Sequence, residues 1–117
     1  MTGGRGSRDK GAKGELEVLD LVRVWWPRAT RNFASGAAGN SDIAHGPAHT
    51  VIECKRTERL RLRDAWRQVE HDAQVAGIGT LPVLATRWNG TPHAPAPWLA
   101  ITELEELLSL IHLRETG

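Results

Sequence analysis

The chain has 117 residues, and 15 Lys and Arg against 14 Asp and Glu give a formal net charge of +1, so charge alone indicates no partner. The length suits one domain with one core, and a single cysteine, Cys54, excludes a disulfide framework and a cysteine-based zinc site. No apolar run approaches the ~18 residues of a membrane span, and the basic start is no secretory signal. We therefore expect an intracellular, cytoplasmic protein. A virus-encoded protein that acts in its host cell is also compatible with these observations.

The first predicted element is a helix from about Asp9 to Trp26, preceded by a flexible basic arm at residues 1–8. Apolar residues recur along it at three- and four-residue steps, and Pro27 ends it. These apolar residues are Leu16, Leu19, Val22 and Trp26.

Three short strands are predicted next, at residues 29–34, 42–45 and 50–55. A loop of small residues, Ser35–Ser41, follows the first strand and can approach a ligand closely. Gly46 and Pro47 predict a hairpin turn between the second and third strands.

The second half begins with an amphipathic helix at residues 62–76, ended by Gly77. Its inward-facing residues are predicted to be Leu62, Trp66, Val69, Ala73 and Ala76. Strands at 81–88 and 98–101 follow, and a capping box of Thr102 and Glu105 starts a last helix to about Leu113. This order predicts a single α/β domain, residues 9–117, with a mixed central sheet flanked by helices.

The predicted hairpin brings two carboxylates together. With its turn centred at 47–48, Asp42 lies opposite Glu53, ~4.5–5.5 Å away at Cβ, and Lys55 shares the face of Glu53. Two carboxylates repel unless a cation lies between them, so the set predicts a Mg²⁺ or Mn²⁺ site with the Cys54 backbone carbonyl as a further ligand. Lys55 would orient or deprotonate an attacking water. The alternative is a surface salt bridge on a solvated sheet face.

A resemblance to a known family begins at these residues. Asp42, ten intervening residues and then Glu53–Lys55 resemble the core motif of the PD-(D/E)xK nucleases, although Ser41 stands where the family often has Pro. Lys10–Glu17 is similar to the opening of the archaeal-type Holliday junction resolvases. Arg31–Gly36 resembles their Arg-then-Ser-Gly segment.

The resemblance covers most of residues 10–110 and implies a restriction-endonuclease-like fold. It implies a homodimer that resolves four-way DNA (Holliday) junctions by paired nicks, with Mg²⁺ and no small-molecule cofactor. It gives Glu15 a catalytic role at the metal and Ser35 a catalytic role, with Ser41 as the alternative serine. Gln68 would be a polar helper.

The charge is concentrated in particular segments. Residues 1–31 carry +3, residues 55–67 carry +4 and residues 103–117 carry −3, which indicates a basic face for phosphates. The candidate DNA-binding residues are Lys10, Lys13, Arg31, Arg56, Arg59, Arg63 and Arg67. A merely solvated surface is the alternative.

Two other functions stay open at this point. One is a restriction- or repair-type nuclease of the same superfamily that acts on other DNA substrates. The other is a non-catalytic DNA-binding module, which predicts no metal site. The complete Asp42, Glu53 and Lys55 set favours an enzyme.

Overall fold

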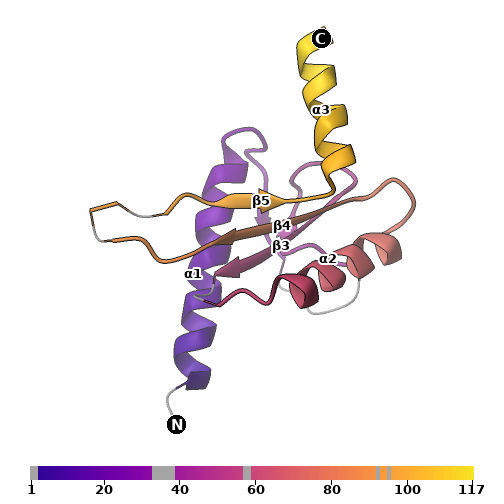
Figure 1. Ribbon diagram of the computed structural model, residues 1–117. Coiled ribbons are helices and arrows are strands. Elements are labelled where there is room, and N and C mark those ends of the chain that lie inside the picture. Colours follow the sequence, from indigo (N-terminus) through magenta and orange to yellow (C-terminus); the bar gives the residue numbers. More distant parts are fainter. Residues whose placement is uncertain (1–2, 33–38, 57–58, 92, 95) are drawn as a thin grey trace.

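The computed structural model describes residues 3–32, 39–56, 59–91, 93–94 and 96–117, with side chains from residue 11 onward. The described residues form three helices and five strands in the predicted order (Figure 1). The elements are α1 (Gly3–Arg23), β1 (Thr30–Arg31), β2 (Ile43–Ala44), β3 (Thr50–Arg56), α2 (Leu62–Ala76), β4 (Leu81–Arg87), β5 (Leu99–Ile101) and α3 (Leu104–Thr116). None of these helices is both long and apolar enough to cross a membrane.

The main sheet has three strands in the order β3-β4-β5. β3 and β4 are parallel, with Glu53 beside Leu84, and β4 and β5 are antiparallel. The parallel pair is joined through α2, the usual crossover for parallel neighbours. The protein is therefore a small α/β protein with a mixed sheet, as the sequence predicts.

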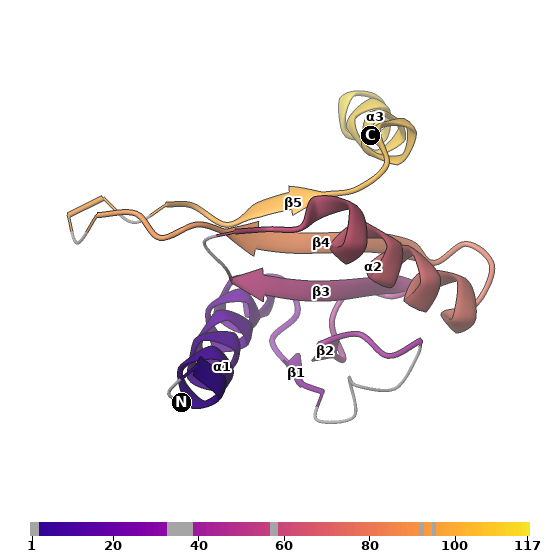
Figure 2. The ribbon, with the colours of Figure 1, turned by 60° about the horizontal axis from the view of Figure 1, so that its bottom comes forward.

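Helices α1 and α2 cover opposite faces of this sheet (Figure 2). Successive strand side chains point to opposite faces, so Ile52 packs with Val18 and Leu19 of α1, while Val51 packs with Val69 of α2. The two small cores share β3 and β4. This alternation places Glu53 and Lys55 on the α2 face.

Helix α1 differs from its predicted bounds at both ends. It begins at Gly3, so residues 3–8 belong to the helix instead of a separate arm, because elongation adds one hydrogen bond per residue once a helix is nucleated. It ends at Arg23 and not at Trp26, because Pro27 disfavours helical geometry in the residue before it.

The predicted hairpin ladder between the second and third strands is wrong. β2 pairs with β1, and the residue before it, Asp42, donates from its N–H to the Ile52 C=O at 2.9 Å. The Ser41 hydroxyl accepts a hydrogen bond from the Ile52 N–H at 2.9 Å, where a backbone carbonyl would accept it in a ladder. Asp42 therefore meets β3 without the regular register that a hairpin would give.

The helix bounds of α2 are confirmed, but its buried face is shifted. Ala65, Val69, Asp72 and Ala73 are buried, whereas Leu62 and Ala76, both predicted to face inward, are exposed. The small residues of α2 pack against β3 and β4, and their size allows the helix to approach the sheet closely.

The predicted capping box of α3 does not form. The Thr102 hydroxyl donates to the Pro82 carbonyl at 2.7 Å, and Glu103 is the N-cap without a side-chain cap. No residue of α3 is buried. Because Thr102 bonds to the sheet, it anchors the last strand instead of the helix start.

Candidate functional site

Asp42 and Glu53 are the two buried acids at the centre of the candidate site. Asp42 follows Ser41, whose hydroxyl binds the backbone of Ile52, so this segment is held against β3. The Asp42 Oδ2 accepts a hydrogen bond from the Cys54 N–H at 2.7 Å. The carboxylate therefore lies beside the strand that carries Glu53, although no hairpin ladder puts it there.

Glu53 is held in an unfavourable environment for a negative charge. Burial, and after it the charge of Asp42, raise its pKa from 4.5 to about 8, although Lys55 offsets part of this increase. Its Oε2 is buried and has no hydrogen-bond partner in the described part of the chain. A buried carboxylate oxygen without a partner is costly, and such groups gather at functional sites.

Two side chains complete the site beside Glu53. Gln68 of α2 donates from Nε2 to Glu53 Oε1 at 3.3 Å, so the predicted helper does reach the acid. Lys55 and Gln68 also line a pocket of about 260 Å³ whose rim carries Arg59 and Arg61. The lining has three cations and one acid, Asp64, and this net positive charge suits a phosphate group.

The donor set fits a hard divalent cation in part. Asp42 and Glu53 supply carboxylates, and the unpartnered Oε2 of Glu53 is free to ligate. The N–H and C=O of one strand residue point to the same side, so the Cys54 carbonyl faces the Asp42 side, as its N–H does. Among the described residues no group of three His, Cys, Asp or Glu side chains could hold a metal, so waters would have to complete the shell.

Glu15 is placed close to the acid pair but is engaged elsewhere. Its charge contributes to the raised pKa of Glu53, yet its Oε2 accepts hydrogen bonds from Arg31 Nε at 2.9 Å and Nη2 at 2.6 Å. The same ion pair occupies Arg31, which was predicted to bind DNA. Ser35 lies outside the described residues, and the alternative serine, Ser41, binds backbone groups.

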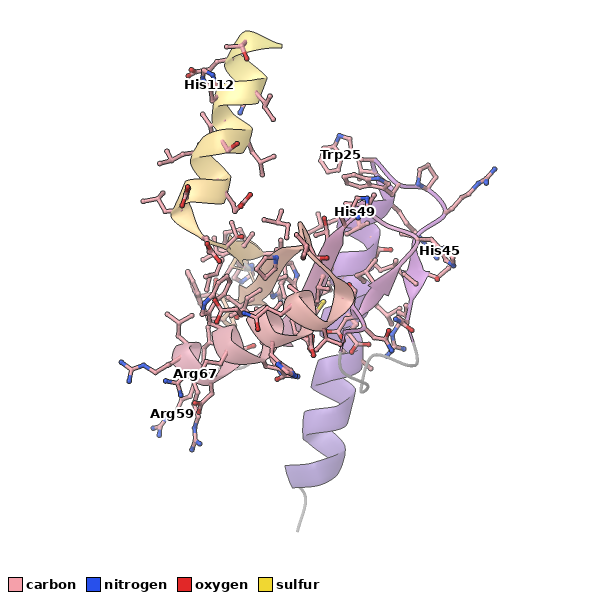
Figure 3. The ribbon with its side chains drawn as sticks, turned by 90° about the vertical axis from the view of Figure 1, so that its right-hand side faces the viewer. Trp25, His45, His49, Arg59, Arg67 and His112 are labelled. Carbon is pink, nitrogen blue, oxygen red and sulfur yellow. The ribbon has the colours of Figure 1, made fainter. Side chains whose placement is uncertain are left out.

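Three of the five predicted DNA-binding arginines are exposed, whereas Arg31 and Arg56 are partly buried in ion pairs. Arg59 and Arg67 extend from the same side of the molecule near α2 (Figure 3), and Arg63 is exposed as well. Arg56 instead lies on the α1 side of the sheet, 3.6 Å from Glu17, with little exposure. Strand alternation turns its side chain away from Lys55. Lys13 is exposed, and the side chain of Lys10 lies outside the described residues.

Two features were missed at the sequence level, one in the site and one on the α1 face of the sheet. Buried Asp72 accepts a hydrogen bond from the Gly39 N–H at 3.2 Å and adds to the raised pKa of Glu53. It lies four residues after Gln68 on the same helix side, a spacing that could have shown it. Glu17 accepts a hydrogen bond from Trp98 Nε1 at 2.8 Å and forms an ion pair with Arg87 at 3.3 Å. These partners are distant in sequence, so no local signal marks them.

Cys54 takes no part as a nucleophile. Burial and the neighbouring acids raise the pKa of its thiol, so the thiol stays protonated at neutral pH. Its side chain packs on the α1 core, and only its backbone faces Asp42. The packing agrees with the expectation of a small side chain in a core, and the role of its carbonyl as a metal ligand stays a prediction.

Comparison of the chain with protein families, with curated proteins and with solved structures finds no match.

Proposed function

We propose that this protein is a Mg²⁺-dependent endodeoxyribonuclease with a restriction-endonuclease-like core, and that it resolves four-way DNA junctions by paired nicks. The observation that carries the proposal is buried Glu53, with one unpartnered oxygen, held beside Asp42 at the edge of a pocket lined by cations. The motif strand β3 lies between α1 and α2 in an α/β fold and carries Glu53 and Lys55 on one face, which supports the same assignment.

Each residue of the site has a role that follows from its contacts. Asp42 and Glu53 would hold the cation, which stabilises charge on a phosphodiester and makes bound water more acidic. Gln68 keeps the Glu53 carboxylate in one orientation through Oε1, which leaves Oε2 to ligate. Lys55 orients the attacking water or the scissile phosphate from the pocket beside them.

The substrate proposal depends on where the cations lie. Arg59 and Arg61 line the pocket at Lys55, and Arg63 and Arg67 continue the exposed basic surface along α2. Such contacts hold the DNA backbone near the acid pair without reading sequence. This suits an enzyme that selects DNA by shape.

The direct test is cleavage mapping on a fixed four-way junction with and without Mg²⁺. The wild-type protein should make symmetric nicks that need the metal. Asp42→Asn should bind the junction and fail to cut it, because the change removes a ligand charge and keeps the side-chain shape. Asp20→Asn, at an exposed acid of α1, is the matched control and should cut normally. Equal cutting by Asp42→Asn contradicts the proposal.

Two further measurements separate the other functions. Competition by linear duplex distinguishes a junction resolvase from a nuclease with other DNA substrates, because only the resolvase should prefer the junction. Calorimetric titration with Mn²⁺ should show binding that Asp42→Asn weakens. A protein that binds DNA but shows no metal binding would instead be a non-catalytic DNA-binding module.

A further inference from the structure

The last helix carries an apolar face that nothing in the described chain covers. α3 extends from the end of β5 away from the sheet (Figures 1 and 2), and none of its residues is buried. Leu104, Leu107, Leu108 and Ile111 recur at three- and four-residue steps and are 42–67% exposed. This spacing is that of a helix face that packs against a partner, and a continuous apolar patch of this kind marks an interaction site.

A groove with matching chemistry lies between α2 and β5. Its volume is about 630 Å³. It is lined by Leu62, Arg63, Trp66, Ile101, Thr102 and Glu103. Leu62 is half exposed and Trp66 is partly buried, so the groove has an apolar floor. Arg63 provides a cation at its rim.

The charges of the helix and the groove are complementary. The first turn of α3 carries Glu105 and Glu106, and residues 103–117 have a net charge of −3. The groove itself is lined by one cation, Arg63, and one acid, Glu103, at its junction with α3. On a helix, Glu105 lies beside Leu108, at the border of the apolar face. The acidic first turn of a helix from a second copy can therefore place Glu105 against Arg63 while its apolar face covers the apolar floor.

The connection to α3 favours the groove of another molecule over its own. Only Thr102 and Glu103 separate β5 from α3, and the Thr102 hydroxyl is bonded to Pro82 at 2.7 Å. Both linking residues line the groove themselves. A helix that starts there and leaves the sheet would need a sharp reversal within these two residues to lie back along the same groove.

We propose that α3 of one copy occupies the groove between α2 and β5 of a second copy, and that the exchange is reciprocal. A 13-residue helix is about 20 Å long. A two-fold axis relates the two contacts, so one self-complementary arrangement covers both helices and closes the assembly. This inference does not depend on the nuclease proposal, because it uses no residue of the acid pair.

The first experiment measures molar mass by sedimentation equilibrium, without metal or DNA. The wild-type protein should have twice the 12.9 kDa mass of one chain. The double variant Leu108→Asp/Ile111→Asp should raise the dimer Kd roughly 100-fold or more. It cannot disturb a core, since both side chains are exposed. Val24→Asp, at an equally exposed apolar residue of another surface, is the matched control. A monomeric wild-type protein at micromolar concentration overturns the proposal.

The second experiment tests the exchange itself by mixing two charge-reversal variants. Arg63→Glu and Glu105→Arg should each weaken the dimer about tenfold, because like charges then meet. An equimolar mixture should restore dimers, because one contact then has the natural pair and the other has the reversed pair. Helices that pair only with each other would leave Arg63→Glu without effect. A helix folded onto its own groove would make mixing ineffective. Either of these results overturns the proposal.

Discussion

Replacement of Glu53 by glutamine should stabilise the metal-free protein at neutral pH while it removes metal binding. Burial and the charge of Asp42 raise the Glu53 pKa from 4.5 to about 8, so the folded protein holds the Glu53 proton more tightly than the unfolded chain. The stabilising contribution is then complete below pH 4.5 and is lost as the pH rises to about 8. The amide of the Glu53→Gln variant would stay neutral at every pH, and its oxygen could still accept a hydrogen bond from Gln68.

The magnitude follows from the width of this pH window. Each pH unit between the two pKa values changes the free energy of unfolding by about 1.4 kcal/mol. Because pH 7 lies about 2.5 units above 4.5 and below the folded pKa, folding must return a proton to Glu53, which costs the metal-free protein about 3 kcal/mol there. Glu53→Gln should therefore exceed the wild type by about 3 kcal/mol at pH 7 and match it at pH 4.

The assay is urea unfolding in EDTA at several pH values from 4 to 8, followed by circular dichroism. The difference between wild type and variant isolates Glu53 from the other carboxylates. Glu115→Gln, at an exposed acid of α3, is the control and should follow the wild type. Saturating Mg²⁺ should then stabilise the wild type and leave Glu53→Gln unchanged. Parallel pH profiles for wild type and Glu53→Gln would refute this reasoning.

Three further outcomes test other parts of the structure. Leu84→Ala removes a side chain with no exposure and should lower the free energy of unfolding by about 2–5 kcal/mol. Ile78→Ala, at a fully exposed side chain, should change it little. Equal urea midpoints for these two variants would mean that Leu84 is not in a core. Ser41→Ala leaves the buried Ile52 N–H without its 2.9 Å acceptor, so it should destabilise the fold by about 1–3 kcal/mol. It should also weaken Mn²⁺ binding in calorimetry, and unchanged binding would show that Ser41 does not position Asp42. Lys55→Met should lower the junction-nicking rate by about 10²-fold or more with Mn²⁺ affinity retained, and a normal rate would remove Lys55 from the chemistry.

Local patterns in the sequence are sufficient for the elements and for part of the site. Apolar periodicity and Gly77 define α2 at residues 62–76 because a helix buries one face and glycine tolerates the backbone that ends it. The two-residue period of a strand puts Glu53 and Lys55 on one face of β3 whatever packs on it. The acid–x–lysine motif could therefore be found without knowledge of the fold.

Contacts between distant segments were decided only by tertiary packing. Asp42 reaches the strand of Glu53 through the Ser41 hydroxyl and the Cys54 N–H, not through a hairpin register, and β2 forms its ladder with β1 instead. Arg56 meets Glu17 only because α1 packs on that face of the sheet.

The net charge of +1 and the segment charges could be read from the sequence, since they need only the residues. Which cations remain exposed could not, because an ion pair such as that of Arg31 with Glu15 forms between segments that folding brings together. The apolar spacing of α3 likewise predicts a packed face. Only the tertiary structure shows that this face is left uncovered, because the direction in which α3 leaves the end of β5 depends on the folded chain and not on local spacing (Figure 1).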